Sequence, residues 1–142
     1  MRYMQVISIG AALLIGNALV VAQTSAPPPP KLGGSYFYKY QKSSKSAVIP
    51  VELSEITVDG ENVRGILSSY RSPAGNCISD NTAFSGTYKD GVLRLKSQPF
   101  KSQFADGRPC GGATIDVKLE GGHATGTLMT GSEVSMLELD AK

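Results

Sequence analysis

The chain is poor in the side chains on which most metalloproteins and hydrolases depend. It contains one histidine, His123, and two cysteines, Cys77 and Cys110, in 142 residues. Because a zinc site needs more nitrogen or sulfur ligands than this, the sequence predicts no metal site. No Ser-His-Asp or Cys-His arrangement is apparent, and His123 follows a Gly-Gly turn, where a solvated residue is expected. We therefore predict no catalytic residue, no cofactor and no enzymatic activity.

Charge of one sign is also scarce. The 14 basic and 12 acidic side chains give a formal net charge of +2. Phosphate binding requires a clustered basic surface, so this balance argues against a nucleic-acid partner. Glu52, Glu55, Asp59 and Glu61 crowd one segment, and paired carboxylates can perform acid-base chemistry. A carboxylate hydrolase is therefore an alternative, although the same spacing suits a solvated strand and turn.

The N-terminal residues have the pattern of an export signal. Arg2 precedes a mostly apolar run over residues 4–21, and Val20-Val21-Ala22 has a small residue at the cleavage position. We predict a signal peptide over residues 1–22, with cleavage after Ala26 and an uncleaved membrane anchor as alternatives. The mature protein is then expected in the periplasm or outside the cell, with no membrane span.

Residues 23–34 are rich in proline and glycine and include four consecutive prolines, Pro27 to Pro30. Such a run has little to bury and favours an extended chain, so we predict a solvated tether. The remaining residues, 35–142, are enough for one domain.

The dominant period in residues 35–142 is two, and no helical pattern is present. Tyr36 and Tyr38 share one face of the first strand, with Phe37 and Lys39 on the other. The Asp90-Gly91 pair joins two alternating runs and is typical of a type I′ hairpin. The predicted strands cover residues 36–41, 48–58, 63–70, 83–89, 92–97, 113–120, 123–130 and 134–140.

These strands predict an all-β fold, an eight-stranded antiparallel up-and-down meander closed into a small barrel. A two-sheet β-sandwich is the alternative. Gly65, Gly86 and Gly126 lie in the middle of strands, where glycine favours bends that curl a sheet. The alternation shifts between Leu53 and Ile56, which indicates a β-bulge.

Alternate connections of a meander lie at the same end. The tight turns at residues 59–60, 90–91 and 121–122 therefore share one end, and the long loops 71–82 and 98–112 share the other. These loops contain Cys77 and Cys110, which in an exported protein are expected to pair. A disulfide closing a loop of this size contributes about 3 to 4 kcal/mol in the chain-entropy model.

The predicted architecture is similar to that of lipocalin-like and avidin-like barrels. The chain contains no tryptophan, so the Gly-x-Trp opening of lipocalins and the biotin-lining tryptophans of avidins are both absent. No functional residue is transferred from either family.

The long-loop end combines basic and aromatic side chains, which can hold an anionic or glycan ligand through charged hydrogen bonds and stacking. The alternative is that the aromatic rings only fill the barrel end and the basic groups, including Lys42 and Lys45, are solvated. The candidate ligand-binding residues are Tyr70, Arg71, Lys101, Phe104 and Arg108.

We predict an exported non-enzymatic binding module that holds a small anionic or carbohydrate-like ligand at this end. The alternative is a protein-binding inhibitor or accessory factor that docks the same loops on another exported protein.

Overall fold

The structure is a computed structural model that describes residues 26–39, 44–71, 77–103 and 106–142. The predicted signal peptide, Lys42 and Phe104 lie outside the described residues. Within the described ranges every regular element is a β-strand, so these ranges contain no helix that could span a membrane.

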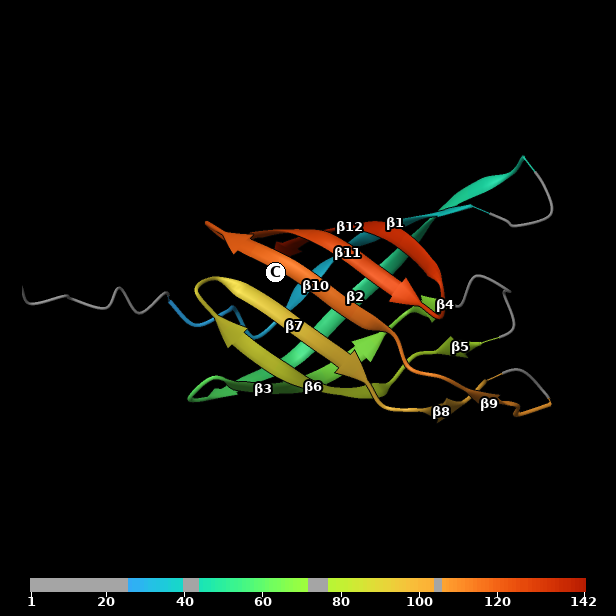
Figure 1. Cartoon of the computed structure of the whole chain (residues 1–142), viewed down its shortest axis with the longest axis horizontal. Helices are drawn as coiled ribbons and strands as arrows, with labels where there is room; N and C mark the ends of the chain where they lie inside the picture. The colour runs from blue at the N-terminus through green and yellow to red at the C-terminus, as the bar shows by residue number, and fades with distance from the viewer. Residues whose placement is uncertain (1–25, 40–43, 72–76, 104–105) are drawn as a thin grey trace, which may run out of the picture.

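Eight strands form a closed antiparallel barrel in the order β1-β12-β11-β10-β7-β6-β3-β2 (Figure 1). Sequential strands of this wall are neighbours, and β1 pairs with β12 to close it. The predicted meander and barrel are therefore confirmed, and the sandwich is excluded. The wall strands are β1 (Leu32–Lys39), β2 (Ser46–Asp59), β3 (Asn62–Ser68), β6 (Thr82–Lys89), β7 (Val92–Ser97), β10 (Thr114–Glu120), β11 (His123–Thr130) and β12 (Glu133–Ala141).

Alternating side chains of the wall fill the barrel interior. Leu93 and Leu95 are buried, for example, whereas Arg94 between them faces solvent. Twenty buried hydrophobic residues form one cluster, which includes the large side chains of Tyr36, Phe84 and Tyr88. The hydrophobic effect thus holds the wall around its own side chains.

Mid-strand glycines allow the wall to bend. A Cβ atom on Gly86 would lie 1.9 Å from the carbonyl oxygen of Arg94, and one on Gly126 would lie 2.0 Å from that of Asp116. Only glycine permits neighbouring backbones to approach so closely. The predicted bulge is also present, because the β2–β3 register shifts between Ser54 and Thr57.

The connections are divided between the two ends as predicted. The tight turns that follow β2, β6 and β10 lie at one end, which we call the turn end (Figure 1). The opposite end, the loop end, has two short antiparallel pairs. They are β4 (Tyr70–Arg71) with β5 (Ile78–Ser79), and β8 (Phe100–Lys101) with β9 (Pro109–Cys110).

The N-terminal proline segment differs from the predicted solvated tether. Strand β1 begins at Leu32, inside the range assigned to the tether, and Pro28 is buried. The bulge in β2 leaves the Ile56 N–H available, and it donates to the Pro30 carbonyl at 3.1 Å. The Tyr88 hydroxyl donates to the Ala26 carbonyl at 2.5 Å. Residues 26–31 therefore pack across the turn end of the barrel, and we call them the proline cap.

Candidate functional site

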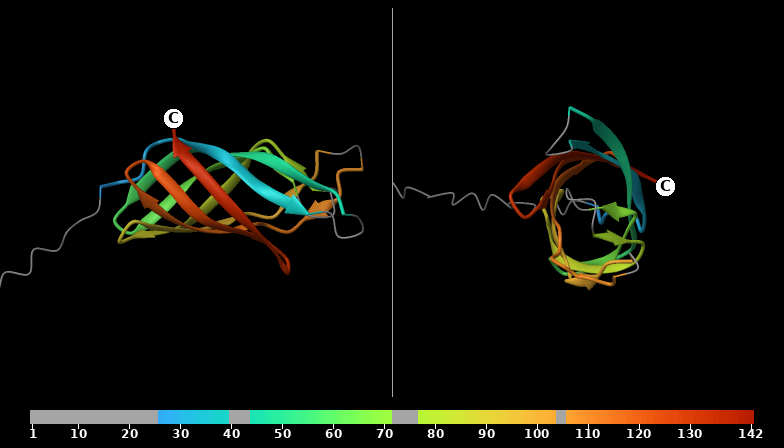
Figure 2. Two further views of the ribbon diagram at one scale, coloured as in Figure 1. Left: turned by 90° about the horizontal axis from the view of Figure 1, so that it is seen from above. Right: turned by 90° about the vertical axis from the view of Figure 1, so that its right-hand side faces the viewer.

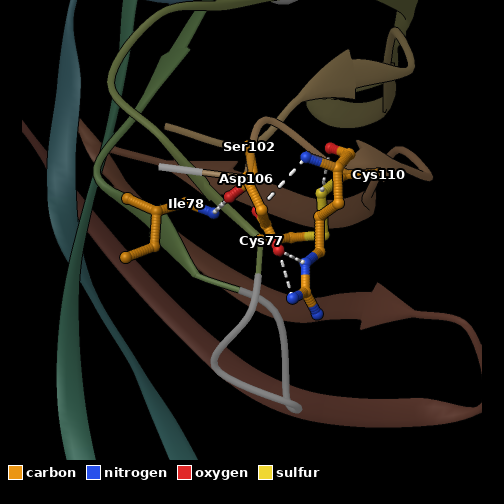
Figure 3. A network of polar contacts seen from close by, with 6 residues as sticks. Cys77, Ile78, Ser102, Asp106 and Cys110 are labelled. Atoms are coloured by element: carbon orange, nitrogen blue, oxygen red, sulfur yellow. Dashed lines mark hydrogen bonds and ion pairs between the residues drawn. A yellow bond between two sulfur atoms is a disulfide. The ribbon is translucent and has the colours of Figure 1, made fainter. Parts of the chain in front are cut away.

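The predicted disulfide joins the two long connections at the loop end (Figure 3). Cys77 and Cys110 are bonded, with their Cα atoms 5.8 Å apart and 33 positions apart in the sequence. The connection after β3 is thereby covalently linked to the connection after β7.

One backbone–side-chain and one backbone–backbone hydrogen bond link the same two connections beside the disulfide. The Ile78 N–H donates to Ser102 Oγ at 3.3 Å, and the Gln103 N–H donates to the Ile78 carbonyl at 3.0 Å. Within the second connection, the Ser102 N–H donates to the Arg108 carbonyl at 2.9 Å. The described residues 69–71, 77–81, 98–103 and 106–112 thus form one cross-linked unit, which we call the loop platform.

Tyr70 belongs to the loop platform, but its side chain is buried beneath the exposed surface of the platform. Its side chain is 1% exposed and packs edge to face on Phe100, with ring centroids 5.9 Å apart. The alternation inside β3 changes at Ser69, which has a positive φ of 59° and directs the next residue inward. The buried Tyr70 side chain thus supports the platform from within, and a contact between Tyr70 and a ligand stays a prediction.

A second tyrosine holds the first platform strand. The Tyr36 hydroxyl donates to the Arg71 carbonyl at 2.6 Å and accepts from the Arg71 N–H at 3.0 Å. Burial raises the pKa of Tyr36. Burial also raises the pKa of Tyr70, and a hydrogen bond with Thr130 offsets part of this effect, so that the pKa of Tyr70 is about 12. Both hydroxyls are therefore neutral at physiological pH and act as hydrogen-bonding groups.

The three predicted basic residues are all exposed on the loop platform. Arg71 lies in β4, Lys101 lies in β8, and Arg108 immediately precedes β9. Arg108 forms an ion pair with Asp106, with Nε 2.6 Å from Oδ2, and this hydrogen bond lowers the pKa of the Asp106 carboxyl (Figure 3). The structure therefore places these three exposed basic residues at the same end of the barrel, while Phe104 lies outside the described residues.

Charges of opposite sign gather at opposite ends of the described barrel. The ion pairs Lys31–Glu52 and Arg94–Asp116 neutralise their own charges along the wall. Of the other described charges, six basic and three acidic residues lie in the loop half, against four basic and seven acidic residues in the turn half. The loop half has Lys39, Lys45, Arg71, Lys96, Lys101 and Arg108 with Asp80, Asp106 and Glu133. The turn half has Arg64, Lys89, Lys118 and Lys142 with Glu55, Asp59, Glu61, Asp90, Glu120, Glu138 and Asp140.

Sequence reasoning missed a group of exposed apolar side chains. Phe37, Val48, Met129, Val134 and Met136 project from four adjacent strands, β2, β1, β12 and β11. We call these five residues the apolar stripe. Strand alternation contained the signal, because Phe37 lies between two inward-facing tyrosines and must point outward.

A groove on the outer wall, lined by both polar and apolar residues, was also not predicted. It has a volume of about 490 Å³ and lies between β2, β3 and β6, with Thr57, Asn62, Arg64 and Thr87 among its lining residues. Arg64 Nε donates to Thr57 Oγ1 at 3.2 Å across it. The bulge in β2 and the missing side chain of Gly86 hollow the wall here. No aromatic residue lines this groove, so it lacks the stacking surface that favours a sugar.

Of the residues considered for chemistry, His123 lies at the turn end, whereas Glu52 lies opposite Ser68 in the β2–β3 register, beside the first residue of the loop platform. His123 Nδ1 is 2.6 Å from Asp140 Oδ1 on the exposed turn end, and Glu52 is paired with Lys31 at 3.0 Å. In the ranges that the structure describes, no group of three or more His, Cys, Asp and Glu residues could hold a metal ion. These contacts suit surface ion pairs, and the absence of catalysis remains a prediction.

The loop platform and the apolar stripe are thus the two surface features that distinguish the loop end. No protein-family model, curated protein or solved structure matches this chain.

Proposed function

We propose that the protein is an exported, non-enzymatic binding module whose loop platform holds a small anionic or carbohydrate-like ligand. The observation that supports this best is the exposure of Arg71, Lys101 and Arg108 in one cross-linked unit at the basic end of the barrel. Guanidinium groups recognise carboxylates, sulfates and phosphates through paired charged hydrogen bonds. The disulfide lowers the entropic cost of ordering these side chains around a ligand.

The ligand in this proposal lies across the platform and not inside the barrel. The interior is occupied by the hydrophobic cluster, and Tyr70 with Phe100 closes its loop end from below. Affinity then comes from a few charge-assisted hydrogen bonds, each of which contributes about 1.5 to 3 kcal/mol. A stacking role for Phe104 remains a prediction.

The filled interior also favours a second candidate, docking of the same platform on another exported protein. A rigid, exposed surface with fixed basic groups suits an acidic patch on a partner as well as it suits a small anion. Export itself is supported by the disulfide, because such bonds persist mainly in oxidising compartments.

A thermal-shift screen tests the first candidate, since a ligand that binds only the native state raises its melting temperature. The oxidised protein is screened against anionic metabolites, sulfated glycans and neutral glycans. We expect an anionic compound to raise the midpoint, and Arg71→Ala/Lys101→Ala to weaken its binding by about tenfold or more. The matched control is Arg64→Ala/Lys118→Ala, which removes two basic groups from the turn end.

Equal binding by both double variants would exclude the platform as the site. A panel without any hit, together with a stoichiometric acidic protein that co-purifies and is lost only in Arg71→Ala/Lys101→Ala, would favour the second candidate.

A further inference from the structure

The apolar stripe is continuous across the two hairpins that meet where the barrel closes. Phe37 lies opposite Val48 in the β1–β2 register, and Met129 lies opposite Val134 in the β11–β12 register. Phe37 is 52% exposed and Met136 is 64% exposed, which is unusual for such large apolar side chains. The stripe occupies only the loop half of these strands.

A groove opens between the two hairpins inside the stripe. Pairing of β1 with β12 ends at Tyr36 and Leu137, although β1 continues to Lys39 and β12 begins at Glu133. Beyond this point the β1–β2 and β11–β12 hairpins diverge (Figure 2). The groove has a volume of about 250 Å³, and Phe37, Val134 and Met136 contribute to its lining.

Lys39 and the acidic Glu133 both line this groove, and further basic residues on the same hairpins and on the loop platform outnumber that one acid. Lys39 follows Phe37 on the outer face of β1, and the exposed Lys45 precedes β2. Arg71 and Lys101 add basic charge at the same end. An exposed apolar surface bordered by basic groups matches the interface of an anionic bilayer, where acyl chains accept the apolar side chains and headgroups attract the charges.

We propose that the apolar stripe and the basic end together bind the surface of an anionic lipid bilayer. The divergent hairpins place Phe37, Val134 and Met136 among the upper acyl chains, while Lys39 and Lys45 lie at the headgroups. The barrel itself stays outside the hydrocarbon. This inference rests in part on the proposed function, because the same basic end supplies the attraction.

Charge favours a bilayer over a second copy of the chain as the occupant. A two-fold dimer through the stripe would bring the two basic loop halves together, and like charges would repel. An anionic surface instead neutralises them. The strands opposite the stripe point polar groups outward, among them Arg64, Ser85 and Lys96, so the barrel binds from one side.

Vesicle co-sedimentation tests the proposal with the protein as recovered after export. We expect binding to vesicles of phosphatidylcholine mixed with phosphatidylglycerol, and much weaker binding to phosphatidylcholine alone. Phe37→Ser/Met136→Ser should weaken binding about tenfold or more, because both side chains lose their place among the acyl chains. Lys39→Gln should weaken it about fivefold, and the matched control Lys118→Gln should leave it unchanged.

The apolar run over residues 4–21 could itself bind vesicles, so hydrogen exchange with and without vesicles is used to locate the contact on the barrel. Amides in residues 37–39 and 133–136 should be protected by vesicles, whereas those of β3 and β6 should not. Circular dichroism checks that the variants are folded.

Three results would overturn the proposal: no binding to either vesicle, full binding by Phe37→Ser/Met136→Ser, or a dimer that this variant abolishes in place of vesicle binding. Soluble anions separate it from the proposed function. A soluble anion that shifts the melting temperature while vesicles fail leaves the platform site intact and refutes only the lipid surface. Vesicle binding unaffected by Arg71→Ala/Lys101→Ala, with no soluble ligand found, would instead refute the platform site.

Discussion

The two ends of this barrel close in different ways. At the turn end, three tight turns and the proline cap close the wall through backbone hydrogen bonds and through the Tyr88 hydroxyl on Ala26. At the loop end, a disulfide, two short strand pairs and a buried tyrosine perform the same task over longer connections. The turn end is acidic and the loop end is basic.

The two ends differ in how much support their connections need before they can carry exposed side chains. Tight turns need little stabilisation, because the residues that they order are few. Long connections lose more chain entropy, so they need covalent and buried support before they can present exposed side chains. The loop end has this support, and it is also the end with exposed basic and apolar groups. Both proposals therefore place binding there.

The largest expected effect comes from removing the covalent support of the loop end. Cys77→Ser/Cys110→Ser should lower the free energy of unfolding by about 3 to 4 kcal/mol, measured by urea unfolding. Native-state hydrogen exchange should show lost protection at Ile78 and Gln103 while the amides of Ile56 and Leu119 at the turn end remain protected. Equal loss at both ends would contradict the independence of the two closures.

Alkaline pH should weaken the loop end next. The pKa of Tyr70 is raised from 10.0 to about 12 by burial, so below pH 10 both folded and unfolded chains keep its proton. Between pH 10 and 12 only the unfolded chain releases it, and stability falls by about 1.4 kcal/mol per pH unit for one such group. Tyr36, also buried, acts in the same direction. Rapid urea unfolding at each pH measures the slope.

Tyr70→Phe is the control for this titration. It should reduce the steepness of the alkaline loss, whatever its effect on stability at neutral pH. An unchanged slope would show that the proton on Tyr70 is not linked to folding.

A smaller effect is expected from the proline cap. Tyr88→Phe removes the donor to the Ala26 carbonyl and should lower the free energy of unfolding by about 0.5 to 1.5 kcal/mol. The control is Thr87→Ala, a neighbour whose side chain faces solvent. If Tyr88→Phe and Thr87→Ala gave the same stability in urea, the hydrogen bond from Tyr88 to the proline cap would contribute nothing to stability.

The smallest effect is expected from the exposed ion pairs of the turn end. Lys89 lies 2.8 Å from Glu61, but solvent screens a pair in which both side chains are exposed. Lys89→Gln should leave the urea midpoint unchanged within error. A clear loss would mean that charge, and not only backbone pairing, holds the tight turns together.

Local sequence patterns predicted most of the barrel wall. Period-two alternation placed the strands, and the Asp90-Gly91 turn aligned β6 with β7 as the register confirms. The shifted alternation after Leu53 predicted the bulge. These features depend on neighbouring residues, so they are visible without knowledge of distant contacts.

The surfaces at the two ends could not be predicted in the same way. Tyr70 ends a predicted strand beside a polar loop, where the sequence suggested an exposed side chain, yet the positive φ of Ser69 directs it into the core. The proline segment appears solvated by composition, yet Ile56 and Tyr88 hold it in place from positions far along the chain. The apolar stripe was visible residue by residue in the alternation, but its continuity depends on which strands are neighbours.

Local residue patterns were enough to predict the strand pattern, the tight turns, the division of the ends and the pairing of two cysteines. Each follows from side-chain period, from positive φ at glycine or from the small number of possible partners. Three features depend on contacts between residues that are distant in the sequence. Tyr70 supports the platform from within, residues 26–31 cap the turn end, and five apolar residues from four strands form one surface. The physical reason is barrel closure, which places β1 beside β12 and so joins surfaces from opposite ends of the chain.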